Sequence, residues 1–260
     1  MGFLQATGKF FGFLIFTAFL AFAIILIGVT NLTTHDSIKQ ISSGILGNQF
    51  SNLSQNDLQA LRYITLTQCG QSSEITYHVS QDFTIQLNCN DVRNSDASQL
   101  PQIMSGAMLD SVYYKKFGCN FSNLIECSQS PANTFQGAPI FFISNEGNQL
   151  YRTATTYSAV IALIGLGILF VSIETWVGRL QGLGWNLVFT AFPVIVLNKV
   201  QSLIPSTGSS DVNAAIKPAI DNFISSLTNM FIIVLVVGIL CLVAGYGIAF
   251  YQKRGTKKKK

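Results

Sequence analysis

The sequence predicts an integral membrane protein: an α-helical four-span bundle with a small, disulfide-stapled α+β extracytoplasmic domain between spans one and two. Two observations lead to this fold class. Only 11% of the 260 residues are charged, whereas soluble domains carry about 25% charged residues. Long apolar runs alternate with polar segments, and the longest polar segment, residues 31–154, holds four of the five cysteines.

The first apolar run covers residues 10–29 without a charged side chain. A helix rises about 1.5 Å per residue, so this run can cross a hydrocarbon core about 30 Å thick. A cleaved signal peptide is the alternative, with an apolar region of about 7–15 residues that ends at a small-x-small site. Val29-Thr30-Asn31 is a poor site of that kind. We therefore expect residues 1–30 to form an uncleaved signal anchor.

Three further spans are expected within residues 155–252, at residues 157–173, 180–198 and 230–251. Arg179 and Lys199 bracket the third of these and can extend toward the two membrane surfaces. Pro193 should kink that span, which a membrane helix tolerates when neighbouring groups satisfy the freed carbonyl. A re-entrant segment, which enters and leaves on one side, is the alternative for this span.

Charge predicts the orientation of the spans. Six of the last eight residues, 253–260, are basic, and basic loops stay on the cytoplasmic side. Four spans then place both termini in the cytoplasm and residues 31–154, with a net charge of −3, outside. A terminal lysine run can also be an added tag. The outer location suits disulfides and the candidate glycosylation sites Asn31, Asn52 and Asn120.

Residue patterns within the outer segment alternate between helix and strand. Helices are expected after Asp36 or Ser37, after Asn56 or Asp57, and over residues 100–116. Residues 74–88 alternate with period two and predict a β-hairpin, and residues 138–143 predict one more strand. The four cysteines allow three pairings, of which we favour Cys69–Cys89 and Cys119–Cys127. Each bridge would contribute about 2–4 kcal/mol to stability.

The segment before the last span, residues 210–227, has the spacing of an amphipathic helix. Its apolar stripe is centred on Ile216, Ile220 and Phe223. Such a stripe must be covered, because a helix exposing it would tend to associate. We expect these three side chains to contact either lipid at the outer membrane surface or the underside of the extracytoplasmic domain.

A search for chemistry predicts no catalytic, cofactor-binding or metal-binding residues. The two histidines, His35 and His78, are interpreted as polar surface and strand residues, and the cysteines lack the paired spacing of a zinc site. The span centres hold no Asp, Glu or His, which disfavours an ion-coupled pump. Two stripes of small residues favour packing inside the chain's own bundle over a homo-oligomer interface: Ser158, Ala162 and Gly165; Gly238, Cys241 and Gly245.

The entry to the third span, Arg179-Leu180-Gln181-Gly182-Leu183-Gly184-Trp185, and the amphipathic helix that leads to Gly238 and Gly245 carry a family resemblance. The chain resembles a group of uncharacterised archaeal and bacterial integral membrane proteins. The resemblance covers the C-terminal part of the chain. It implies one N-terminal span, an extracytoplasmic domain and three C-terminal spans, and it implies no activity.

The function predicted from these patterns is that of a non-enzymatic membrane protein of the cell envelope. Its outer domain would bind another protein or a cell-surface component, or act as an accessory subunit of a membrane complex; nucleic acid is not an expected partner. A transport or channel component is the alternative, with the third span lining the path through Trp185, Asn186, Thr190, Pro193 and Asn198. A membrane enzyme using His35, Asp36 or His78 is the third hypothesis.

Overall fold

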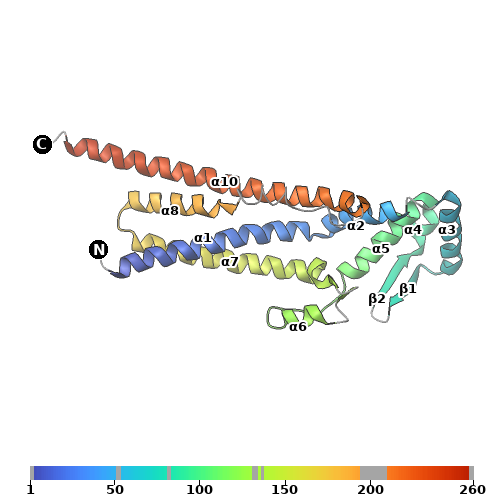
Figure 1. The fold of residues 1–260 in the computed structure, drawn as a ribbon. Helices are drawn as coiled ribbons and strands as arrows, with labels where there is room; N and C mark the ends of the chain where they lie inside the picture. The colour runs from blue at the N-terminus through green and yellow to red at the C-terminus, as the bar shows by residue number, and fades with distance from the viewer. Residues whose placement is uncertain are drawn as a thin grey trace. The chain divides into compact units, whose positions relative to one another are not determined.

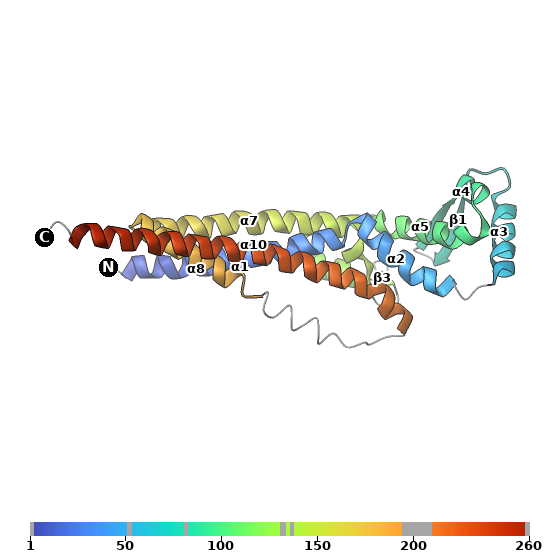
Figure 2. The same cartoon turned by 90° about the horizontal axis from the view of Figure 1, so that it is seen from above.

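The computed structural model describes residues 3–50, 54–80, 83–130, 134–135, 138–193 and 210–257. The described residues are mostly helical, and Figures 1 and 2 show the path of the chain. The chain divides into two compact units. Unit 1 comprises Met1–Val29, Tyr151–Pro205 and Asp221–Lys260, and unit 2 comprises Thr30–Leu150 and Ser206–Ile220.

Three helices are long and apolar enough to cross a membrane: α1 (Phe3–Leu32), α7 (Asn145–Ser172) and α10 (Ser210–Lys257). Even the shortest, with 28 residues, spans about 42 Å, which exceeds a hydrocarbon core of about 30 Å. Their large apolar side chains are exposed, for example Leu163 at 65%, Val171 at 85% and Leu240 at 62%. A row of exposed apolar side chains suits lipid and not water, so the helices are those of a membrane protein.

The expected third span is only partly described. Helix α8 (Trp176–Thr190) has 15 residues, about 22 Å, which is shorter than the hydrocarbon core. It begins after Thr175, whose Oγ1 accepts a hydrogen bond from the Gly178 N–H at 3.1 Å. It ends three residues before Pro193, so Pro193 lies outside α8. Residues 194–198 lie outside the described part, so a full crossing and the re-entrant alternative both stay predictions.

Glycines allow the helices of unit 1 to approach closely. A Cβ atom added at Gly12 of α1 would lie 2.7 Å from the Leu169 nitrogen of α7, and one at Gly165 would lie 2.7 Å from the Phe16 nitrogen. Helices α8 and α10 also approach closely, because a Cβ at Gly184 would lie 2.9 Å from the Gly238 oxygen. Small residues at helix crossings are the usual device for such packing in membranes.

The predicted small-residue stripes therefore contribute to packing within the chain. Ser158 and Ala162 are buried on α7, and Gly238 and Gly245 face α8. The remaining stripe residue, Cys241, is half-buried and free of any disulfide. Whether the chain also forms a homo-oligomer stays a prediction.

Residues 210–227 form the first part of α10, which continues without a break through Pro218 to Lys257. The side chain of Ile216 lies outside the described part, and Ile220 is half-buried. Phe223 packs against a buried cluster of Ile24, Leu227 and Phe231, a contact that the sequence did not predict. A separate interfacial helix is not seen, and lipid contact at Ile216 and Ile220 stays a prediction.

Unit 2 is built from short helices and two small sheets. The predicted hairpin is present, and Ile75 pairs with Leu87 and Tyr77 with Ile85. The predicted strand over residues 138–143 is wrong, because only its first two residues pair and the rest form a tight helical turn. The elements are α2 (His35–Phe50), α3 (Gln55–Cys69), β1 (Glu74–Ser80), β2 (Phe83–Asn88), α4 (Cys89–Asn94), η1 (Ala97–Gln99), α5 (Leu100–Tyr113), α6 (Leu124–Gln129), β3 (Thr134–Phe135), β4 (Ala138–Pro139) and η3 (Ile140–Ile143).

The core of unit 2 lies between the hairpin and α5. Leu87, Val92 and Leu100 are buried together there. The structure joins Cys69 to Cys89, with Cα atoms 5.7 Å apart, and Cys119 to Cys127, which are the two pairings that the sequence favours. Cys69 and Cys89 are fully buried. This disulfide therefore fixes the end of α3 to the start of α4 within the core.

The N-terminal cap of α3 is Ser54, and the expected cap at Asn56 or Asp57 is wrong. Ser54 Oγ accepts from the Asp57 N–H at 3.2 Å, and the Ser54 N–H donates to Asp57 Oδ2 at 3.1 Å. This reciprocal capping box satisfies two N–H groups that helix geometry leaves unpaired. The hydrogen bonds from the Ser54 side chain and backbone lower the pKa of Asp57. Their stabilising effect is present above the ordinary carboxyl pKa and is lost as the pH falls through the lowered value.

The two ends of unit 2 are joined by a buried asparagine. Asn148 Nδ2, on α7, donates to the Thr30 carbonyl at 2.7 Å and to Thr33 Oγ1 at 2.9 Å. Asn148 is 3% exposed, and a buried amide that lost these partners would be costly. Ser144 Oγ caps the same helix by accepting from the Gly147 N–H at 3.1 Å. The end of α1 and the start of α7 are therefore held side by side.

A matched pair of glycines on α7 tests the packing of unit 1. Gly165→Ala should destabilise the chain by about 1–3 kcal/mol, because the new methyl group must displace the α1 backbone. Gly167→Ala should leave stability unchanged or raise it, because nothing lies within 4 Å of the added Cβ and Ala favours helix over Gly. Thermal unfolding of both variants in one detergent compares them. Equal transition temperatures would contradict the close α1–α7 approach.

Candidate functional site

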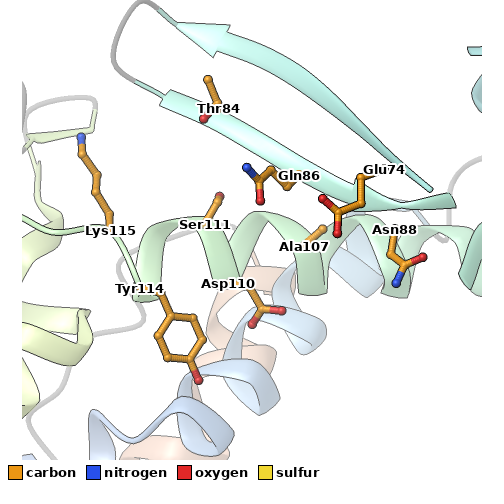
Figure 3. Close-up of a pocket in the computed structure, with 9 residues that line it drawn as sticks. All are labelled: Glu74, Thr84, Gln86, Asn88, Ala107, Asp110, Ser111, Tyr114 and Lys115. Atoms are coloured by element: carbon orange, nitrogen blue, oxygen red, sulfur yellow. The ribbon is translucent and has the colours of Figure 1, made fainter. Parts of the chain in front are cut away.

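A polar groove of about 540 Å³ lies between the hairpin and α5 in unit 2 (Figure 3). The strand side comes from the alternation of β2, because successive side chains of a strand point to opposite faces. Leu87 points into the core, so Gln86 and Asn88 point to the other face. The residues that line the groove are Glu74, Thr84, Gln86, Asn88, Ala107, Asp110, Ser111, Tyr114 and Lys115.

The helix side of the groove follows helical spacing. Ala107, Asp110, Ser111 and Tyr114 follow the spacing i, i+3, i+4 and i+7, so they form one stripe along α5 and its C-cap. The same face nearer the start of the helix, which includes Leu100, Ile103 and Met104, packs into the core. Pro101 lies in the first turn of α5, where the missing N–H costs no helical hydrogen bond. One amphipathic helix thus supports both the core and the groove.

Charges of both signs are spread along the groove. Lys115 lies at one end and Glu74 with Asn88 at the other, as Figure 3 shows. Lys115 Nζ lies 5.4 Å from the centre of the Phe117 ring, a distance at which a cation is attracted to the ring face. Asn88 Oδ1 accepts from the Asn90 N–H at 2.9 Å. Asn88 therefore caps α4 while its side chain also lines the groove.

His35 is fixed beside the groove by Asp110. His35 Nε2 lies 2.6 Å from Asp110 Oδ1, and a carboxylate can only accept, so the ring nitrogen donates. The His35 ring also lies 5.1 Å from the Tyr113 ring centre and 5.5 Å from that of Tyr114. His35 is the first residue of α2, so this contact ties α2 to α5. Sequence reasoning missed the pair, because the two residues are 75 positions apart and no local pattern links them.

Asp36 and His78, the other two residues proposed for an enzyme site, have different surroundings. Asp36 Oδ1 lies 3.7 Å from His35 Nδ1, and its side chain is fully exposed. His78 pairs with Thr84 in the hairpin register, and its side chain lies outside the described part. Among the residues that the structure describes, no group of three His, Cys, Asp or Glu side chains comes together as metal ligands would.

The candidate glycosylation sites have different surroundings. Asn31 lies in the last turn of α1, and its backbone carbonyl accepts hydrogen bonds from Thr34 and Ser37. Asn120 lies in the loop closed by Cys119–Cys127, where its Oδ1 accepts from the Ser122 N–H at 2.9 Å. Asn52 lies outside the described part. Use of any of these sites stays a prediction.

The third-span residues proposed for a transport path do not share one surface. Asn186 and Thr190 are fully buried. Asn186 Oδ1 accepts from Thr17 at 2.9 Å, and its Nδ2 donates to the Gly182 carbonyl at 2.8 Å. Trp185 is 45% exposed. Pro193 follows the end of α8, and Asn198 lies outside the described part. The buried amide therefore already has partners for both of its polar atoms within the bundle.

The fold and the groove define a helical membrane protein that carries a disulfide-containing polar unit with an open, mixed-charge groove. No known family model matches the chain, and no curated protein or solved structure matches it either. The resemblance seen at residues 179–185 therefore rests on the sequence pattern alone. Any function must be argued from the residues themselves.

The His35–Asp110 contact can be tested by a double-mutant cycle. His35→Ala and Asp110→Ala should each destabilise unit 2, and the double variant should lose less than the sum, because the bond is lost only once. We expect a coupling of at least about 0.5 kcal/mol, measured by denaturant unfolding. Glu74→Ala, which removes the other groove carboxylate, is the control and should show no coupling to His35→Ala. Additive effects for the His35–Asp110 pair would contradict the contact.

Proposed function

We propose that the chain is a non-enzymatic, multi-pass protein of the cell membrane whose residues 31–154 lie outside the cell and bind a protein partner. The partner is either a separate protein or the other subunits of a membrane complex. The groove between β2 and α5 is the observation that carries this proposal. Both termini would be cytoplasmic, as the basic C-terminal residues predict.

The lining of the groove suits a protein segment better than a small apolar ligand. Small-molecule sites are mostly apolar with a few polar groups, whereas eight of the nine side chains lining this groove are polar, charged or phenolic. Glu74 and Asp110 favour a basic group of the partner, and Lys115 favours an acidic one. A partner segment that carries charges of both signs would therefore bind in one orientation along the groove.

Aromatic residues near the basic end of unit 1 support a membrane boundary at that end. Trp176 is 77% exposed and Tyr251 is 81% exposed, and such rings gather where a membrane meets water. Arg179 lies 5.3 Å from the Trp176 ring centre, and Arg254 lies 4.5 Å from that of Phe250. The basic residues of this end, 253–260 above all, make it the candidate for the cytoplasmic interface.

The transport and enzyme hypotheses have weaker support. The Asn186 amide, which would line a path, is satisfied within the bundle. The His35 ring is held against Asp110 and two tyrosine rings. That arrangement explains His35 as a link between α2 and α5 without a reaction.

Site-specific photocrosslinking tests the proposed binding surface. A photoreactive amino acid in place of Gln86, inside the groove, should yield a covalent adduct with another protein in native membranes. The same amino acid in place of Gln59, which is exposed on α3, is the matched control and should yield none. Adducts from both positions, or from Gln59 alone, would place binding elsewhere. No adduct from either position in native membranes would reject the proposal.

A further inference from the structure

The hairpin of unit 2 is a sheet of only two strands, so each strand has one edge without a neighbouring strand. In an antiparallel pair, the backbone groups of alternate residues point toward the partner strand, and those of the residues between them point away. The Cys89 N–H donates to the Ser73 carbonyl at 2.8 Å, just before β1 begins. The next bonded pair along the ladder is therefore Ile75 with Leu87.

The backbone groups of Thr84 and Gln86 consequently point away from β1, toward the outer edge of β2. Within the described part of the chain, neither residue has a hydrogen bond to a segment outside the hairpin. Unpaired N–H and C=O groups along the edge of a sheet are a template on which another strand can form. The outer edge of β2 therefore presents two residues that can pair with an extended chain.

The polar groove runs along this edge of β2. Helix α5 packs against β2 and not to the same extent against β1, and Thr84 and Gln86 both line the groove. Thr76 lies opposite Gln86 on β1, and it is not one of the lining residues. The groove is therefore on the β2 side of the hairpin, with α5 as its other wall (Figure 3).

An extended segment is the kind of chain that can pair with this edge. A helical segment bonds its N–H and C=O groups within itself, so it offers none to Thr84 or Gln86. A strand rises about 3.4 Å per residue, so residues 84–88 are about 14 Å long and can lie beside about five residues of a partner. In strand addition, the main-chain bonds contribute affinity and the alternate side chains contribute specificity.

The charges at the two ends of the groove supply such specificity. Lys115 lies at one end and Glu74 at the other, as Figure 3 shows. Opposite charges at the matching ends of a bound segment would be attracted to them, and the reversed arrangement would be repelled. The edge of β2 thus fits an extended segment with an acidic side chain near one end and a basic side chain near the other.

We propose that the groove binds an extended segment of a different protein chain, which adds to β2 as the third strand of the hairpin sheet. The backbone of this segment pairs with the N–H and C=O groups of Thr84 and Gln86. Its acidic side chain faces Lys115, and its basic side chain faces Glu74. This inference rests on the proposed function, because it states how the partner of that same groove is held.

Proline substitutions test the strand addition. Gln86→Pro removes an N–H that points away from β1, so the bonds between the two strands are kept. Thr76→Pro is the matched control, because Thr76 lies opposite Gln86 and its N–H points to the other edge of the hairpin. Each proline follows a strand residue, and the extended conformation is the one that proline favours in the residue before it.

The readout is crosslinking from the other wall of the groove. A photoreactive amino acid replaces Ser111, on the α5 side, and the yield of its adduct with another protein is measured in native membranes. Mass mapping of the Cys69–Cys89 bridge first verifies that each variant has folded. Gln86→Pro should lower the adduct yield about tenfold, because the partner's carbonyl loses its donor. Thr76→Pro should leave the yield unchanged.

Two further variants complete the test. Gln86→Ala removes the same side chain and keeps the N–H, so it should lower the yield much less than Gln86→Pro does. Thr84→Pro should act like Gln86→Pro, which keeps the test valid if one of the two proline variants does not fold.

An unchanged yield with Gln86→Pro and Thr84→Pro would overturn the strand addition and leave the groove as a binding surface. Equal losses with Gln86→Pro and either Gln86→Ala or Thr76→Pro would overturn it as well, because the N–H at the β2 edge would then not be the cause. An adduct between two copies of this chain would also overturn it. The absence of any adduct from Ser111 and Gln86 in the unsubstituted hairpin would reject the proposed function, and this inference with it.

Discussion

The close, antiparallel approach of α1 and α7 is the constraint on which the structure depends. Gly12 faces the backbone of Leu169, and Gly165 faces that of Phe16. At these positions the backbones of the two helices approach so closely that a larger side chain would push them apart. Antiparallel neighbouring spans return the chain to the side it left. The residues between them must then fold as one segment on one side of the membrane, and this segment is the Thr30–Leu150 part of unit 2. Lipid supplies no hydrogen bonds, so these helices must satisfy their own backbones.

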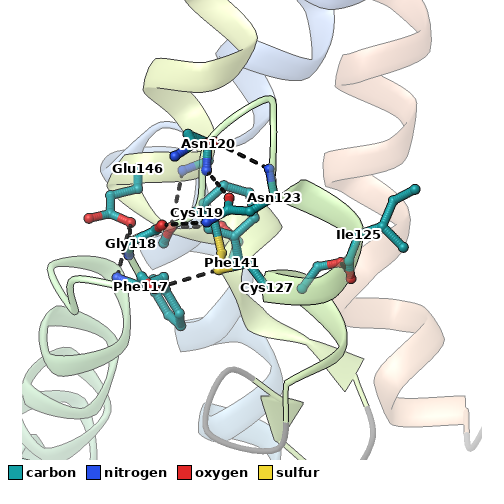
Figure 4. The surroundings of a disulfide bond; sticks show 12 residues. Phe117, Gly118, Cys119, Asn120, Asn123, Ile125, Cys127, Phe141 and Glu146 are labelled. Carbon is teal, nitrogen blue, oxygen red and sulfur yellow. Dashed lines mark hydrogen bonds between the residues drawn. A yellow bond between two sulfur atoms is a disulfide. The ribbon is translucent and has the colours of Figure 1, made fainter.

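In unit 2, polar side chains and disulfides, rather than glycines, hold neighbouring segments together. Asn148 joins the end of α1 to the start of α7 through two hydrogen bonds, and Glu146, two residues earlier, accepts hydrogen bonds from the N–H groups of Phe117 and Gly118 (Figure 4). The Cys69–Cys89 bond fixes the hairpin region, against which α5 builds the groove. The groove therefore rests on covalent and buried supports.

Local patterns predicted the parts of the fold that depend on local physics. Period-two alternation gave the hairpin, and apolar length gave α1, α7 and α10. Residues 138–143 were misread because an apolar run of β-formers can also close a tight helical turn. Long-range pairs carry no local signal, so the His35–Asp110 bond and the packing of Phe223 against the cluster that contains Ile24 could not be predicted. The groove was missed for the same reason, since three separate segments line it.

Accessibility of single cysteines from outside intact cells tests the central claim, that residues 31–154 face outward and both termini face the cytoplasm. In the Cys241→Ala background, Gln59→Cys on α3 and Gln252→Cys near the end of α10 both place a thiol at an exposed position. An impermeant thiol reagent should label the cysteine at 59 in intact cells and the one at 252 only after the membrane is opened. Labelling of the cysteine at 252 but not the one at 59 in intact cells would contradict the account.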